Sequence, residues 1–201
     1  MNDLLAHLPF RNGHFVLESG YHTDIWITLD ALFLEPRRVA PAVQVLAPML
    51  AAHEVTAICG PLLGGAFLAH AVATALGARF YYTELDQRSD NAALFGTRYR
   101  LPPALARTAG AERFAVVDDV ISAGSSVRAT VAAIEAAGGS TVVVGALMVL
   151  GAAGRDHFAQ AQLPVRALGE RDFNLWNPLD CPLCQAGVVL QRPEHRDDPN
   201  A

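Results

Sequence analysis

Two adjacent carboxylates, Asp118 and Asp119, directly follow a short apolar, β-branched run at residues 114–117. A small-residue loop comes after the intervening Val-Ile pair, and consists of Ser122, Ala123, Gly124, Ser125 and Ser126. A helix is expected next, over residues 127–137. Exposed backbone N–H groups and the start of a helix favour a bound phosphate, while carboxylates, which only accept hydrogen bonds, suit a ribose diol or a hydrated Mg²⁺. The stretch therefore predicts a sugar-phosphate site at the carboxyl end of a strand.

An ordinary strand–loop–helix connection could use the same residue types as capping residues. The full pattern of an apolar run, two aspartates, two apolar residues and S-A-G-S-S is present, however. It resembles the phosphoribosyl-diphosphate (PRPP) signature of type I phosphoribosyltransferases. The resemblance implies that Asp118 and Asp119 are catalytic residues that hold the ribose hydroxyls, and that residues 122–126 bind the 5-phosphate. It also implies Mg²⁺ as the cofactor, with Asp119 as an indirect or weak ligand.

The N-terminal region contains a predicted β-hairpin, with one strand over residues 13–20 and the other over residues 21–29. A short amphipathic helix is expected before it, over residues 2–9. The string GHFVLESGYH resembles the N-terminal segment of orotate phosphoribosyltransferases, where it forms a hood over the base. The resemblance implies a base site containing Glu18, Ile25 and Trp26. In familiar orotate enzymes a lysine takes the place of Glu18, and an acid there should repel the orotate carboxylate unless it faces away.

A second strand–loop–helix unit precedes the signature, with a strand at 55–59, a loop at 60–65 and a helix at 66–76. By resemblance the loop binds diphosphate through Pro61, Leu62, Leu63 and Gly64. The alternative is a plain turn whose glycines permit positive φ. In many orotate enzymes a lysine takes the place of Gly64, so in this chain diphosphate contact would depend on the backbone alone.

Residues 84–101 show no clear period and carry several arginines, which is typical of a mobile active-site loop. In orotate enzymes the matching loop contains a catalytic lysine and often a histidine, and it closes over the partner subunit's site. This loop has neither residue. Arg88, Arg98 or Arg100 could neutralise the diphosphate, and we assign Arg88 and Arg98 to diphosphate binding and Arg98 to catalysis. The alternative is a solvated β-hairpin with scattered charges.

The alternation of strands and helices predicts an α/β fold with a mostly parallel sheet covered on both faces. A helix is expected over 36–52, and further strands over 79–83, 141–150 and 165–168. The doubly wound strand order is implied by the family resemblance. We expect a single domain, 1–201, with a core of about 36–169 and a hood formed by about 1–35 together with a C-terminal tail of about 170–201.

The composition limits the possible classes of protein. A net charge of −5 and a pI of about 5.7 argue against a nucleic-acid-binding surface. The chain contains no lysine, which limits any mechanism that requires one. No uncharged apolar run is long enough for a membrane span, so no membrane association is expected. Three cysteines and the absence of a signal-peptide pattern indicate a cytoplasmic protein.

The C-terminal Cys181-Pro-Leu-Cys184 motif has three interpretations. It could be half of a zinc site, with His157 and His195 as possible further ligands; it could be a redox pair; or it could be a packed turn with inert thiols, which we prefer. The motif also resembles the tail of one bacterial branch of orotate phosphoribosyltransferases.

The sequence as a whole predicts a phosphoribosyltransferase, a pentosyltransferase that moves ribose 5-phosphate from PRPP to a base nitrogen and releases diphosphate. The expected acceptor is orotate, in pyrimidine biosynthesis. Two alternatives stay open: transfer to another base such as a purine, and a PRPP-binding regulator with little catalysis. Three lysine positions of the best-known orotate enzymes are lost, which favours the alternatives, whereas the intact signature favours an enzyme. The partners are PRPP and a small base, and the family is dimeric, so a homodimer is expected.

Overall fold

The computed structural model describes residues 10–17, 19–27, 29–86 and 98–192 of the 201-residue chain. Its main sheet has six strands in the order β5-β4-β3-β6-β7-β8. Only the short β5 runs antiparallel to its neighbour. The strands are β3 (Ala57–Pro61), β4 (Arg79–Leu85), β5 (Tyr99–Arg100), β6 (Arg113–Ile121), β7 (Ser140–Leu150) and β8 (Val165–Arg171).

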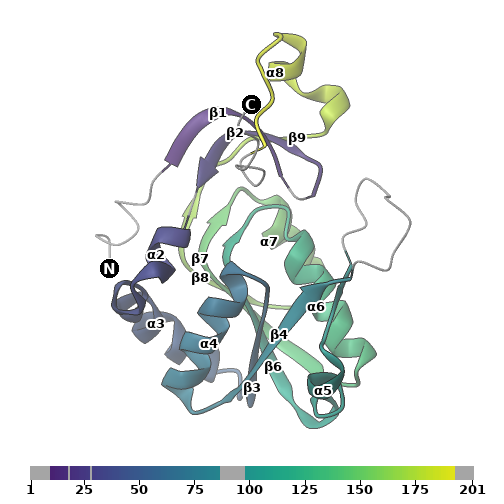
Figure 1. The fold of residues 1–201 in the computed structure, drawn as a ribbon. Coiled ribbons are helices and arrows are strands. Elements are labelled where there is room, and N and C mark those ends of the chain that lie inside the picture. The colour runs from purple at the N-terminus through teal and green to yellow at the C-terminus, as the bar shows by residue number, and fades with distance from the viewer. Residues whose placement is uncertain (1–9, 18, 28, 87–97, 193–201) are drawn as a thin grey trace.

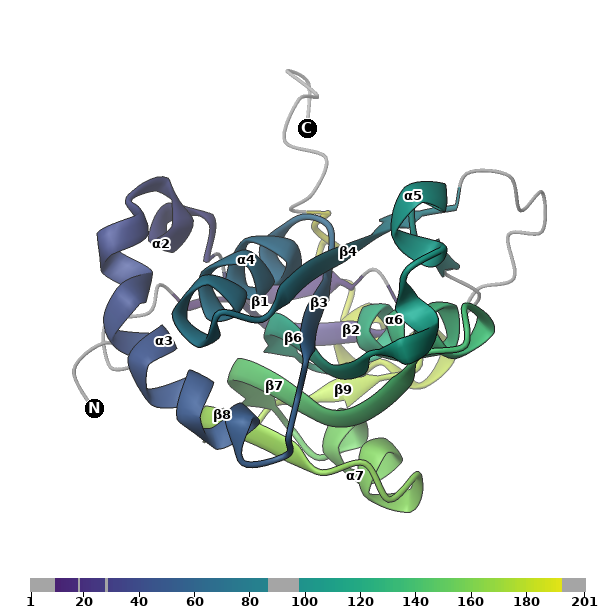
Figure 2. The same cartoon turned by 90° about the horizontal axis from the view of Figure 1, so that it is seen from below.

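Helices cover both faces of this sheet (Figures 1 and 2). On one face lie α2 (Asp30–Leu34), α3 (Pro36–Ala51) and α4 (Gly64–Leu76), packed on a core that includes Ile58, Val117 and Leu147. On the other face lie α5 (Pro103–Ala106), η1 (Ala109–Ala111), α6 (Ser125–Ala136) and α7 (Ala153–Gln160). Because both faces are covered, the central strands are mainly apolar, as expected for a parallel sheet.

The chain reverses its direction of winding between β3 and β6. From β3 it proceeds to β4 on one side, and from β6 it proceeds to β7 and β8 on the other. In open α/β sheets the crevice at such a switch point, outside the carboxyl ends of the strands, is where ligands bind. The two predicted phosphate loops follow these two strands, so the topology brings them together.

A second, three-stranded sheet combines the two ends of the chain. Its order is β1-β2-β9, with β1 (Phe10–Val16), β2 (His22–Ile27) and β9 (Leu175–Trp176), all antiparallel. The segments η2 (Pro178–Asp180) and α8 (Pro182–Gln185) follow β9. Figure 1 shows this unit, which we call the hood, beyond the end of the main sheet to which β7 and β8 point.

The α/β class, the mostly parallel sheet and the N-terminal hairpin are confirmed, but several element boundaries differ from those predicted. The signature strand β6 includes both aspartates and extends to Ile121, because β7 pairs with it as far as Val149. Helices α4 and α6 each begin two residues earlier than predicted, at Gly64 and Ser125. Helix α7 was not predicted, and the helix expected over residues 2–9 lies outside the described residues.

Among the described residues, no helix combines the length and the apolar character that crossing a membrane requires.

Candidate active site

The two aspartates lie near the end of β6 and differ in their surroundings. Asp118 is buried, and its Oδ2 accepts a hydrogen bond of 2.8 Å from Ser126 Oγ. Its Oδ1 accepts one of 3.1 Å from the backbone N–H of Asp119. Burial, and secondly the neighbouring charge of Asp119, raise the pKa of Asp118 well above its usual value. Asp119 is less buried, and its Oδ1 accepts a hydrogen bond of 2.8 Å from the backbone N–H of Val120.

The loop after β6 leads directly into the N-terminus of α6. Gly124 has φ of 73° and is the residue before the first turn, a left-handed conformation that glycine adopts without strain. Ser125 and Ser126 are therefore the first residues of a twelve-residue helix, where backbone N–H groups are unpaired within the helix and attract anions. The guanidinium of Arg128 donates to Ser125 Oγ at 3.3 Å, which places a positive charge beside this loop.

The glycines of residues 60–65, where β3 ends and α4 begins, are required for close packing. A Cβ on Gly64 would lie 2.4 Å from Asp119 Oδ2, and one on Gly65 would lie 2.7 Å from Asp118 Oδ1. A Cβ on Gly60 would lie 2.1 Å from the carbonyl oxygen of Gly65. None of the three glycines has positive φ, so this turn does not use the left-handed conformations that glycine permits. Instead, the missing side chains bring this loop against both aspartates.

A cleft of about 570 Å³ lies between the hood and the carboxyl ends of β3 and β6. This volume is in the usual range for small-molecule sites, about 300–1,000 Å³. Thirteen of the predicted site residues line it: Ile25, Trp26, Pro61, Leu62, Leu63, Gly64, Asp118, Asp119, Ser122, Ala123, Gly124, Ser125 and Ser126. The predicted base, diphosphate and 5-phosphate segments thus share one cavity.

Three predicted residues are not placed in this cleft. Glu18 and Arg88 lie outside the described residues. Arg98 is described and exposed, but it does not line the cleft. The ends of the predicted loop form an antiparallel ribbon in which Glu84 pairs with Arg100 and Leu85 with Tyr99. The base of this segment is therefore a β-hairpin, which was the alternative interpretation. Arg100 forms an ion pair of 2.6 Å with Glu84.

Arg11 and Ser19 are the most informative of the cleft residues that the sequence did not predict. Arg11, on β1 opposite Trp26, is the only cationic side chain among the described residues that line the cleft. Ser19 is buried, and its Oγ has no hydrogen-bond partner among the described residues. Such an unsatisfied buried hydroxyl is costly unless a ligand or water completes it. The sequence around Arg11 is that of any solvent-exposed strand. Only the register of the hairpin could have revealed that Arg11 lies opposite Trp26.

Three known proteins that resemble this chain are phosphoribosyltransferases by name. No protein-family profile matches the chain. An orotate phosphoribosyltransferase of Thermus thermophilus is 35% identical over 179 residues, which cover 89% of this chain and 91% of the relative. Among solved structures, adenine phosphoribosyltransferase from Thermoanaerobacter pseudethanolicus superposes with a TM-score of 0.66 at 14% identity, covering 85% of this chain and 99% of that one. Mycobacterium tuberculosis orotate phosphoribosyltransferase in complex with PRPP superposes with a TM-score of 0.57 at 18% identity, covering 72% and 80%.

A switch-point cleft built from a glycine-containing loop, a loop of serine and glycine, and an acidic pair, beneath a separate hood, defines a type I phosphoribosyltransferase fold. Within this class, the match to the Thermus relative over nearly its whole length is decisive. The chain belongs to the orotate phosphoribosyltransferase family.

Proposed function

We propose that the protein transfers ribose 5-phosphate from PRPP to orotate, forming orotidine 5-monophosphate and releasing diphosphate. In the reaction the bond from ribose C1 to the diphosphate oxygen breaks, and a bond from C1 to a ring nitrogen of the base forms. The observation that carries the proposal is the convergence of Asp118, Asp119, the 60–65 loop and the 122–126 loop in one cleft. A PRPP-bound neighbour of the same fold and the orotate-named relatives support this assignment.

The chain would act mainly by positioning and by stabilising charge. The 5-phosphate would bind at the N-terminus of α6, with the hydroxyls of Ser125 and Ser126 and the charge of Arg128 beside it. The ribose hydroxyls would be oriented by Asp118 and Asp119, of which Asp118 is held rigidly by Ser126. The diphosphate would contact the backbone of residues 61–64, since no side chain can be accommodated at Gly64 without moving Asp119. Closure of the hood over the base would exclude water.

The acidic pair suits a Mg²⁺ ion that is bound partly by the protein and partly by the substrate. Asp119 offers carboxylate oxygens to the cleft, which are the ligands that Mg²⁺ prefers. Among the described residues, the acidic pair is not part of a cluster of three or more metal-ligating side chains. Mg²⁺ is commonly bound by one or two carboxylates together with substrate phosphates, which matches this arrangement. When bound with PRPP, it would supply positive charge at the diphosphate.

The acceptor assignment depends on the hood. Orotate carries a carboxylate, and Arg11 offers the cation that the lost lysine positions no longer supply. Its guanidinium also donates to Gln191 Oε1 at 3.2 Å, and Gln191 is in turn bound to β1 through its backbone. Ser19 Oγ would hydrogen-bond a ring substituent, and Ile25 and Trp26 would contact the base. A planar arginine suits a carboxylate through two parallel hydrogen bonds.

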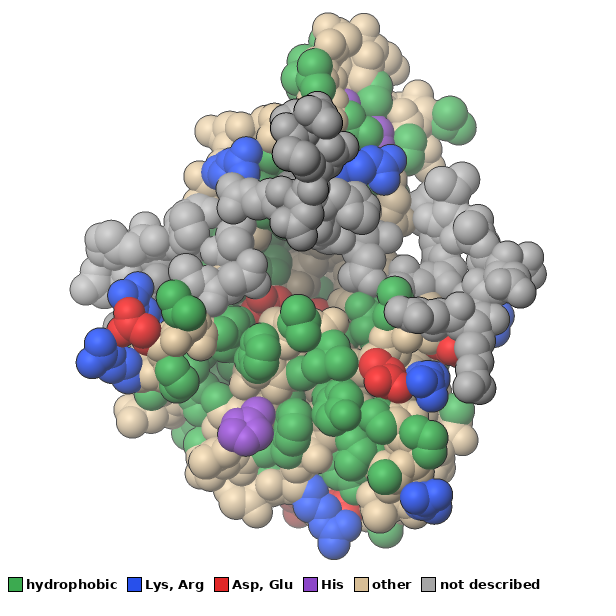
Figure 3. Space-filling view, in the orientation of Figure 1, with side chains coloured by type: hydrophobic (Ala, Val, Ile, Leu, Met, Phe, Trp, Pro, Cys, Tyr) green, Lys and Arg blue, Asp and Glu red, His purple; other side chains and the backbone are tan. Residues whose placement is uncertain are grey.

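The active form would be a cytoplasmic homodimer. The exposed large apolar side chains among the described residues include Leu62, Leu63, Phe67 and Leu85. Figure 3 shows hydrophobic side chains gathered over the region of α4 and β4 on this face. Leu62, Leu63 and Leu85 also line the cleft, so a second copy covering them would lie against the substrate site. Sedimentation of wild-type protein beside a Phe67→Glu variant tests this, since the variant should sediment as a monomer.

Binding of PRPP, measured by calorimetry with Mg²⁺ present, tests the donor assignment. The double variant Asp118→Asn with Asp119→Asn should lose most of the affinity of the wild-type protein, whereas Asp156→Asn, at an exposed position that does not line the cleft, should keep it. Unchanged PRPP affinity in the double variant would refute the proposed donor site.

A further inference from the structure

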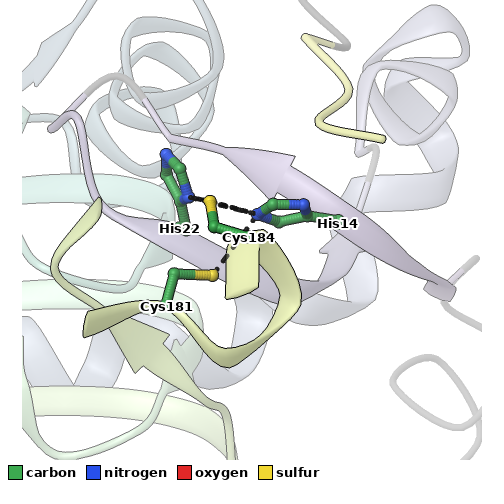
Figure 4. Close-up of side chains that lie close together, drawn as sticks. All are labelled: His14, His22, Cys181 and Cys184. Atoms are coloured by element: carbon green, nitrogen blue, oxygen red, sulfur yellow. Dashed lines mark hydrogen bonds between the residues drawn. The ribbon is translucent and has the colours of Figure 1, made fainter. Parts of the chain in front are cut away.

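Four metal-ligating side chains from the two ends of the chain converge in the hood, away from the cleft. His14 is on β1, His22 is on β2, Cys181 immediately precedes α8 and Cys184 lies within it. Their donor atoms all lie within 4.8 Å of one another. None of the four residues lines the substrate cleft. Figure 4 shows the two imidazoles facing the two thiols across the space between the hairpin and α8.

The separations of these atoms are close to those of a tetrahedral zinc site. His14 Nε2 lies 3.1 Å from His22 Nδ1. The nitrogen–sulfur distances are 3.4 Å from His14 Nε2 to Cys181 Sγ, 3.7 Å from His14 Nε2 to Cys184 Sγ, and 3.3 Å from His22 Nδ1 to Cys184 Sγ. A regular tetrahedron with Zn–S of about 2.3 Å and Zn–N of about 2.0–2.1 Å has N–N edges of about 3.3–3.4 Å and N–S edges of about 3.5–3.6 Å.

Hydrogen bonding alone does not account for this cluster. His14 Nδ1 lies 2.8 Å from the carbonyl oxygen of Val188, which can only accept, so Nδ1 carries the proton. In the neutral ring, His14 Nε2 is then an acceptor with a single lone pair. Three polar atoms, one from each of the other three residues, nevertheless lie within 3.7 Å of it. One lone pair cannot satisfy three donors, whereas a cation at the centre takes up all four lone pairs.

The backbone is arranged to present these ligands. The β1–β2 register shifts by one residue between Asn12 and Phe15, a bulge that contains His14. Bulges commonly redirect a side chain. The two cysteines are separated by two residues in a tight turn, closed by a hydrogen bond from the Gln185 N–H to the Cys181 carbonyl oxygen. This spacing is the usual one for a pair of structural zinc ligands. A metal-bound imidazole usually donates its other N–H to a carbonyl or carboxylate, which orients the ring. The hydrogen bond from His14 Nδ1 to the Val188 carbonyl oxygen is a contact of this kind.

We propose that His14, His22, Cys181 and Cys184 bind one structural Zn²⁺ that joins the N-terminal hairpin to the C-terminal tail. With four protein ligands and no open position, the site holds the fold together and is not catalytic. Two thiolates balance the charge of the ion, which favours binding at a largely buried position where His14, His22 and Cys181 are almost fully enclosed. The preference for inert thiols is replaced by this proposal, and His157 is not among the four residues that converge. His195 lies outside the described residues.

Regular pairing between the tail and the hairpin is short, so such a link would stabilise the hood. β9 pairs with β2 through only two residue pairs, His22 with Trp176 and Thr23 with Leu175. Small units that cannot bury a sufficient core are commonly stabilised by a metal or a disulfide. Arg11 and Trp26 lie on the same hairpin and line the cleft, so the ion would fix the position of the base site from behind.

Metal analysis of untagged, reduced protein tests the proposal without any measurement of activity. After gel filtration in chelator-free buffer we expect one zinc ion per chain. The double variant Cys181→Ser with Cys184→Ser should lose it, and Cys59→Ala, which removes the cysteine outside the cluster, should retain it. Zinc far below one per chain in wild-type protein reloaded with Zn²⁺, or full zinc in the double variant, would overturn the proposal.

Substitution by Co²⁺ provides a second test that needs no variant. A tetrahedral site with two thiolates gives strong visible d–d bands and thiolate-to-cobalt charge transfer, and these should disappear as Zn²⁺ is added. A weak spectrum typical of octahedral oxygen ligation would overturn the proposal, as would a Cys181–Cys184 disulfide in protein kept under reducing conditions. Because neither test uses PRPP or orotate, failure of the zinc site and failure of the proposed reaction are distinguishable.

Discussion

Gly64 and Asp119 approach each other so closely that a methyl group on Gly64 would lie 2.4 Å from Asp119 Oδ2. The two residues come from different elements, Gly64 from the first turn of α4 and Asp119 from the end of β6, and meet at the switch point of the sheet. A lysine, which the family resemblance predicts at position 64, could not be introduced here unless Asp119 moved. Glycine at position 64 and the position of Asp119 therefore belong to one arrangement of the cleft.

Gly64→Ala should weaken PRPP binding because the new methyl group displaces the Asp119 carboxylate. A contact made by a charged group contributes about 1.5–3 kcal/mol, so the affinity should fall by about 10- to 100-fold. The measurement is PRPP calorimetry. Gly110→Ala is the control, because a Cβ there has no neighbour nearer than 3.6 Å, and it should bind PRPP normally. Tight binding by Gly64→Ala would show that Asp119 does not contact the ribose.

Asp118→Asn should stabilise the ligand-free protein at neutral and alkaline pH. The raised pKa of Asp118, caused first by burial, means that the folded state holds its proton more tightly than the unfolded state. The contribution to stability is complete below the unfolded pKa of about 3.9 and is lost as the pH rises through the native value. Asparagine does not ionise and suffers no such loss.

Thermal unfolding of the wild-type protein and of Asp118→Asn as a function of pH measures this effect. The difference in Tm should grow in favour of the variant as the pH increases, while PRPP binding by the variant falls. A difference in Tm that does not change with pH would show that the buried carboxyl is not a source of instability.

Arg11→Ala should raise the KM for orotate and leave the KM for PRPP unchanged, since Arg11 lines the cleft from the hood, on the side of the predicted base site. Loss of a charge-assisted contact predicts an increase of about 10- to 100-fold. Arg37→Ala is the matched control, because that side chain is 86% exposed on α3 and does not line the cleft. Equal effects of Arg11→Ala on both KM values would assign the residue to hood stability in place of base recognition.

Thr83 and Thr130 join β4 to α6 through a buried hydrogen bond of 2.7 Å between their hydroxyl groups. Thr83→Val leaves the Thr130 hydroxyl buried without this partner and should reduce the free energy of unfolding by about 1–3 kcal/mol. The double variant with Thr130→Val should recover much of that loss, because both hydroxyls are then replaced by groups of similar shape. Urea unfolding of the four proteins measures the coupling. Additive effects would show that the two hydroxyls do not stabilise each other.

Much of the lining of the cleft was predictable because it is local in sequence. The acidic pair and the small residues after it occupy one continuous stretch, 113–128, and the loop at 60–65 repeats the same strand–loop–helix arrangement. Apolar runs such as 141–150 identify buried parallel strands without further information. These features depend on neighbours in the chain, which periodicity and residue type describe well.

The remaining features depend on contacts that the sequence alone does not specify. The His14–Cys184 cluster needs a strand bulge on one side and a turn about 170 residues away on the other. The role of Gly64 depends on close approach to Asp119 and not on its own backbone angles. Helix α7 shows no apolar stripe, since only Gly154 and Phe158 are buried in it.

Diphosphate release measured with PRPP, Mg²⁺ and a panel of bases tests the central claim most directly. We predict rapid release with orotate, little with adenine, guanine, hypoxanthine or uracil, and none with orotate when Asp118 and Asp119 are both replaced by asparagine. Release with a purine but not with orotate, or PRPP binding without release for any base, would contradict the account.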